Sequence, residues 1–128
     1  MQIGHHVRVS TQDWRVVLRQ EFAAEPGSFL LALRCDLRWD HGAFSHLTHA
    51  MEQCCRALAG VGVVERWLAE GFWYLSWFPR SWTDHDAWAE NPERDQIDAG
   101  TEKLEGLAYW FFMGEPATIN GSDRPQST

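Results

Sequence analysis

Three histidines are the residues of this chain best suited to bind a metal ion or to move a proton. His46 and His49 belong to the segment HLTH, and a spacing of three brings two side chains to one face of a helix. Zinc sites in proteins use three or four ligands. The pair therefore needs a partner from elsewhere, such as His85, Asp86 or Cys35, and we expect no bound metal and no cofactor.

The cysteines and glycines form no catalytic pattern. Cys54 and Cys55 are adjacent and make an odd set with Cys35, which does not suit a disulfide framework and fits reduced thiols in the cytoplasm. No oxyanion-binding group or strand-to-helix turn accompanies the adjacent pair, so buried thiols are expected there. Gly60-Val61-Gly62 lacks the third glycine of a dinucleotide-binding turn. No catalytic residue is predicted.

The strongest pattern is an acidic run in the second half of the chain. Residues 84–105 contain eight acidic and two basic side chains, a net charge of −6, whereas residues 1–83 contain eight of each sign. A surface of one sign accelerates encounter with an oppositely charged partner. The plainer interpretation is a solvated surface that keeps the protein soluble. Direct binding of nucleic acid is disfavoured, because Lys and Arg make the phosphate contacts.

Tryptophans surround this acidic run in the sequence. Tryptophan is a common anchor at protein interfaces, although it also fills protein cores. We expect Trp73 and Trp110 in the core, and leave core and interface open for the two tryptophans of the polar segment that follows Pro79. The predicted partner-binding residues are Trp82, Asp84, Asp86, Trp88, Glu90, Glu93, Asp95 and Asp98.

Two segments near the N-terminus alternate between apolar and charged residues. Residues 31–39 (LALRCDLRW) have a period of two, which predicts a half-buried strand. Residues 14–22 fit a strand and also fit a helix, and we assign a strand. Pro26 and Gly27 between them predict a turn. Residues 3–9 are a candidate third strand.

Three later segments have helical spacing. The first begins at Asp40 as the N-cap and ends at Gly60, and the second runs from residue 63 or 64 to just before Pro79. The third runs from Thr101 to Gly114. Residues 79–98, with their prolines and polar side chains, are predicted to be an ordered irregular crossing.

Together these elements predict an α+β fold, with an N-terminal antiparallel β-hairpin or three-stranded sheet packed by about three α-helices. The alternative is an all-α bundle. The 128 residues, 45% of them apolar, suffice for one core without disulfides or metals, so residues 1–114 form a single domain and residues 115–128 a flexible tail. No signal peptide is recognised, and the most apolar stretch, residues 71–78, is too short to span a membrane.

The predicted function is that of a non-catalytic protein-binding domain. Its acidic, tryptophan-bearing surface is expected to bind and inhibit a basic protein, such as a nuclease or another nucleic-acid-binding protein, in the manner of immunity proteins or anti-defence inhibitors. One alternative is a small enzyme or metal- or ligand-binding domain that uses His46, His49, His85 and an aromatic pocket. Another is a structural subunit of a larger assembly.

Overall fold

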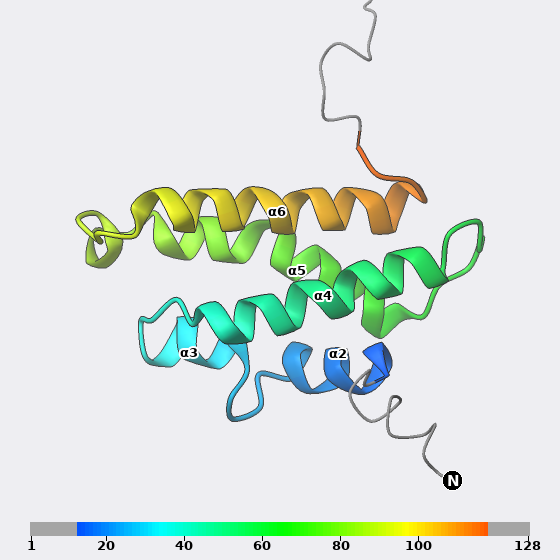
Figure 1. Cartoon of the computed structure of the whole chain (residues 1–128), viewed down its shortest axis with the longest axis horizontal. Helices are drawn as coiled ribbons and strands as arrows, with labels where there is room; N and C mark the ends of the chain where they lie inside the picture. Colours follow the sequence, from blue (N-terminus) through cyan, green and yellow to red (C-terminus); the bar gives the residue numbers. More distant parts are fainter. Residues whose placement is uncertain (1–12, 118–128) are drawn as a thin grey trace, which may run out of the picture.

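The computed structural model describes residues 13–117, and this part of the chain is a helical bundle without a β-strand (Figure 1). Its elements are α2 (Trp14–Phe22), α3 (Phe29–Cys35), α4 (His41–Ala57), α5 (Arg66–Thr83), the 3-10 helix η1 (Asp86–Trp88) and α6 (Arg94–Met113). The predicted α+β fold is therefore wrong, and the all-α alternative fits. The candidate third strand, residues 3–9, lies outside the described residues.

The first alternating segment forms helix α2 because its caps and its core face agree on a helix. The Asp13 side chain accepts a hydrogen bond from the amide of Arg15 at 3.1 Å and caps the N-terminus. Val17, Leu18 and Glu21 are buried at spacings of one and three, and Val16, which the strand assignment placed inside, is exposed. A strand would bury every second residue instead.

The second alternating segment is divided between helix α3 and the connection to α4. Ser28 caps α3 by accepting from the amide of Leu31 at 3.2 Å, and the helix buries Phe29, Leu30, Ala32 and Leu33. Leu37 lies in the left-handed region with φ of 50°, just beyond the helix, and its side chain is exposed. The period of two in residues 31–39 therefore spans two different local structures, the end of α3 and the connection that follows it.

Helix α4 is confirmed as predicted. The carboxylate of Asp40 accepts from the amide of Ala43 at 3.0 Å, which satisfies one free N–H of the first turn. Leu47, Met51 and Cys54 face the core, and the chain leaves the helix before Gly60, whose φ is 82°. The cap, the apolar spacing and the terminating glycine all indicate the same element.

Helix α5 passes through Pro79, where the sequence predicted its end. Proline has no N–H to donate to the previous turn, which normally breaks a helix. Here the last turn is held by other contacts: Thr83 Oγ1 donates to the carbonyl of Pro79 at 2.8 Å, and Trp82 Nε1 donates to the carbonyl of Leu33 at 2.9 Å. The irregular crossing predicted for residues 79–98 is therefore shorter than expected, because its first residues belong to α5.

Helix α6 begins at Arg94, earlier than the predicted start at Thr101. The Arg94 guanidinium donates to the Asp98 carboxylate and to the Thr83 carbonyl, both at 2.7 Å, and so joins the start of α6 to the end of α5. Thr101 is buried inside the helix. The predicted C-terminus is confirmed, since Gly114 follows the last helical residue with φ of 85°.

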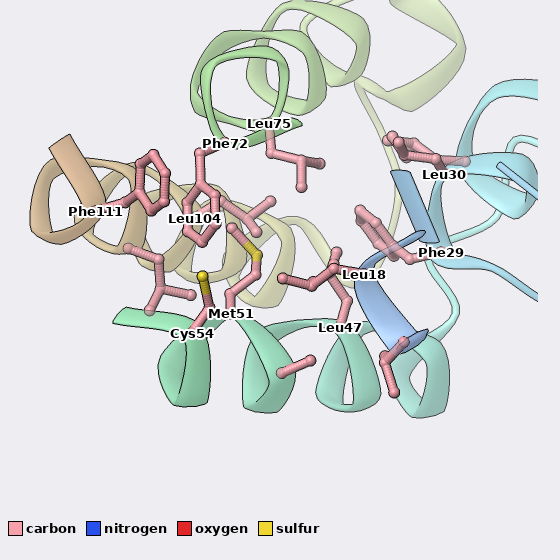
Figure 2. Packing of buried hydrophobic residues seen from close by; sticks show 14 of the residues in the cluster. Leu18, Phe29, Leu30, Leu47, Met51, Cys54, Phe72, Leu75, Leu104 and Phe111 are labelled. Atoms are coloured by element: carbon pink, nitrogen blue, oxygen red, sulfur yellow. The ribbon is translucent and has the colours of Figure 1, made fainter. Parts of the chain in front are cut away.

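The core lies where α4 meets α2 on one side and the antiparallel pair α5 and α6 on the other (Figures 1 and 2). Toward the C-terminal end of α6, the rings of Phe72 and Phe111 stack 4.2 Å apart. Leu18, Met51 and Leu104 point toward the same interior (Figure 2). No helix of the described part of the chain has both the length and the apolar character needed to cross a membrane.

Candidate functional site

The acidic run forms one end of the bundle, which we call the acidic end: Asp84, Asp86, Glu90, Glu93, Asp95 and Asp98. These residues lie on the connection from α5 through η1 to the first turns of α6, at the left of Figure 1. The acidic residues that are close in the sequence therefore also lie close in the fold, and a residue from a distant segment lies beside them. Glu93 Oε2 lies 3.1 Å from Nε2 of His41, the first residue of α4.

Some of the carboxylates at and beyond the acidic end are already paired. Arg94 bonds to Asp98 and holds the pKa of that carboxyl below its usual range. Further along α6, Arg80 donates to Glu105 at 2.6 Å. Apart from Glu93, which contacts His41, the remaining acidic side chains of residues 84–105 are exposed and make no ion pair or side-chain hydrogen bond with the described residues: Asp84, Asp86, Glu90, Asp95 and Glu102. The acidic end therefore has exposed carboxylates that no described cation neutralises.

The two tryptophans predicted to bind a partner differ in their surroundings. Trp88 is only 2% exposed and belongs to the core, so its ring is not presented to solvent. Trp82 is partly buried; its indole N–H is used by Leu33, and its ring stacks on Phe78 with centroids 5.5 Å apart. Of the pair, Trp82 alone has ring surface at the edge of the acidic end.

The exposed tryptophans are on α5, and the sequence prediction missed them. Trp73, which was expected in the core, is 56% exposed, and Trp77 is 41% exposed. Both stand on the face of α5 opposite the buried Leu68, Phe72 and Leu75. This spacing was visible in the sequence, because residues 73 and 77 are out of phase with the core positions.

These rings belong to a continuous series, which we call the aromatic stripe: Trp73, Tyr74, Trp77, Phe78 and Trp82. Trp73 and Trp77 meet edge to face at 5.4 Å, and Tyr74 stacks on Phe78 at 4.7 Å. The stripe runs along α5 and ends beside Asp84, the residue that follows the helix, so the aromatic stripe adjoins the acidic end. Trp73 and Tyr74 also line a pocket of about 500 Å³ with Phe22, Leu30, Arg34, Glu70 and Gly71.

Among the described residues, the histidines and cysteines do not come together as a metal-binding group. His46, His49 and His85 are exposed, and residues 13–117 contain no cluster of three possible metal ligands. Cys54 and Cys55 are buried, as predicted, and burial raises the pKa of each thiol to about 12, which disfavours the reactive thiolate. The aromatic pocket beneath Trp73 contains none of the three histidines.

A buried carboxyl, Glu21, is the functional group that sequence reasoning missed altogether. It is 5% exposed and lines a pocket of about 450 Å³ between α2, the following loop and the start of α4. Its Oε1 accepts from the amide of Phe29 at 2.9 Å. Burial, with the nearby charge of Asp40, raises the pKa of Glu21 to about 7. Strongly shifted carboxyls in pockets are a feature of functional sites.

Comparison with known proteins adds no relative: the chain matches no family model, no curated protein and no solved structure.

Proposed function

We propose that this chain is a non-catalytic protein-binding domain that holds a basic partner protein against the acidic end and the aromatic stripe. The single observation that carries the proposal is the position of exposed, unpaired carboxylates at the end of a helix that also exposes Trp73 and Trp77. Interfaces commonly combine such aromatic anchors with charged edges.

The charge supports a basic partner through the rate of association. The Debye length is about 8 Å at physiological ionic strength, so carboxylates that lie together act as one field on an approaching molecule. Asp84, Asp86, Glu90 and Asp95 have no described cation to neutralise them. A surface that attracts Lys and Arg also competes with nucleic-acid phosphates for them, which favours inhibition of a nuclease or another nucleic-acid-binding protein.

The aromatic stripe supports a long-lived complex. Exposed tryptophan rings cost free energy in water and gain it when a partner covers them. Trp73 and Trp77 hold each other edge to face, so little side-chain entropy is lost on binding.

We propose a cytoplasmic location, since Cys35, Cys54 and Cys55 are free thiols.

The test compares two double variants that change the net charge equally. A partner is first captured from the native cell, and its association rate is measured at two ionic strengths. We expect Asp86→Asn with Glu90→Gln to slow association severalfold at low salt and to weaken its salt dependence. The control, Glu65→Gln with Glu115→Gln, removes two exposed carboxylates outside the acidic end and the aromatic stripe.

Trp73→Ala and Trp77→Ala test the stripe in the same assay. Each is expected to raise the dissociation rate more than tenfold with little change in association, as for a buried interface anchor. If both double variants slow association equally and neither tryptophan variant changes dissociation, the proposed surface is wrong.

A further inference from the structure

The pocket around Glu21, which we call the Glu21 pocket, is made by three segments. Gln20 and Glu21 come from α2, Glu25 to Ser28 from the loop that follows, and Asp40 to His46 from the start of α4. We propose that this pocket binds one alkylammonium or guanidinium group against the Glu21 carboxylate.

Glu21 has unused capacity to accept hydrogen bonds. Oε1 accepts from the amide of Phe29, whereas Oε2 has no hydrogen-bond or ion-pair partner among residues 13–117. Trp67 Nε1 is the one side-chain N or O atom of residues 13–117 that is both buried and without a partner, so Oε2 of Glu21 is open to the pocket and to solvent. The pocket supplies space beside this oxygen, and a cation with two or three N–H groups can replace water as its donor.

The charges around the pocket all favour a cation. Its lining contains three carboxyl groups, those of Glu21, Glu25 and Asp40, and no Lys or Arg. Asp40 is already engaged, since it accepts from the amide of Ala43 and from Arg38 at 3.2 Å. His46 from α4 also lines the pocket and is exposed to solvent. Glu21 is therefore the buried carboxylate left for a ligand.

The size of the pocket suits a small group. A volume of about 450 Å³ lies at the lower end of the range for small-molecule sites, which begins near 300 Å³. It holds an aliphatic chain with a terminal ammonium or guanidinium group, together with a few waters.

Proton and cation would compete for the same carboxylate. With a pKa of about 7, Glu21 is about half protonated at neutral pH when the pocket is empty. A bound cation stabilises the ionised form, so its binding must release this proton. Affinity should therefore rise between pH 6 and pH 8, by about tenfold for a group with this pKa.

The cation can come from two sources, a free polyamine or a Lys or Arg side chain of the partner. Asp40 in the pocket adjoins His41, which contacts Glu93 of the acidic end, so a bound protein's side chain has a short path to Glu21. Only this second source rests on the proposed function. Small amines test the pocket without any partner protein. A negative result for the pocket would therefore leave the proposal for the acidic end to be tested separately.

The experiment is an NMR titration of the labelled protein with three probes at pH 8: spermidine, Nα-acetyl-lysine methylamide and Nα-acetyl-arginine methylamide. The amide signal of Phe29 is the reporter, because this N–H donates to Glu21. We expect it to shift with at least one probe, with a millimolar dissociation constant. Glu21→Gln should weaken binding at least tenfold while it keeps an acceptor for Phe29, and Glu70→Gln on α5 should change nothing.

A second titration at pH 6 tests whether the pH dependence of binding comes from Glu21 or from His46. The loss of affinity at low pH should persist in His46→Asn, which removes the imidazole that lines the pocket. Tighter binding of spermidine assigns a free polyamine, and tighter binding of a capped amino acid assigns a partner's side chain. The proposal is overturned if no probe shifts Phe29, or if Glu21→Gln binds the probes as well as the unaltered protein does.

Discussion

The Glu21 carboxyl makes stability depend on pH in a direction opposite to that of most carboxyls. Its pKa is raised from 4.5 to about 7 in the folded protein. The folded state therefore holds a proton that the unfolded state has lost between these values, and stability falls as pH rises from about 4.5 to 7. The full shift corresponds to up to about 3 kcal/mol.

Replacing this group by glutamine should remove that loss. We expect Glu21→Gln to unfold at the same temperature as the unaltered protein at pH 4, and roughly 10 °C higher at pH 8. Glu25→Gln, an exposed neighbour in the loop, is the control and should shift little at either pH. Thermal unfolding followed by circular dichroism measures both. Equal midpoints for Glu21→Gln and the unaltered protein at pH 8 would contradict the raised pKa.

Two glycines of α6 differ in what surrounds them. A Cβ at Gly100 would overlap the indole of Trp39, which is buried and also packs edge to face on Phe29 at 4.8 Å. A Cβ at Gly106 meets nothing within 4 Å. The absence of a side chain at residue 100 thus allows α6 to approach the α3–α4 connection closely.

Alanine substitutions at these two positions should have opposite signs. Gly100→Ala is expected to destabilise the protein by about 1–3 kcal/mol through overpacking. Gly106→Ala should stabilise it by roughly 0.5–1 kcal/mol, because alanine loses less backbone entropy in a helix. Urea unfolding of both variants checks this. A stabilising Gly100→Ala would mean that Trp39 moves freely to make room.

The elements that were predictable from the sequence are those in which cap and period agree. Asp40, the apolar positions of α4 and Gly60 all indicate one helix, and Gly114 ends α6 as expected. Helices α2 and α3 are short, and seven to nine residues fit either period. The caps at Asp13 and Ser28 favour the helix in both segments, whereas the alternation of apolar and charged residues favours a strand.

The remaining errors come from tertiary contacts that no local rule contains. Helix α5 continues beyond Pro79 because Trp82 bonds to Leu33 in α3, far away in sequence. The acidic end could be located because its charges are consecutive in the chain. The Glu21 pocket could not, since it exists only where α2, the loop after it and α4 meet.

At the scale of the whole molecule, the acidic end should contribute to encounter and little to folding. The variant Asp84→Asn, Asp86→Asn, Glu90→Gln and Asp95→Asn removes exposed charges, and we expect its free energy of unfolding to stay within about 1 kcal/mol of the original. Arg94→Gln, which loses the contacts to Asp98 and Thr83, should cost more. Urea unfolding distinguishes them, and a large loss in the fourfold variant would assign these carboxylates a structural role.

The gathering of carboxylates at the junction of α5 and α6 also gives the molecule a polarity. Residues 84–105 carry a net charge of −6, most of the chain's −7, so the negative charge of the described residues is concentrated toward one end of the bundle. The electric field of a cationic surface therefore orients the protein before the two come into contact. The protein should therefore adsorb end-on to an anion exchanger, with the loop between α4 and α5 facing away from the resin (Figure 1).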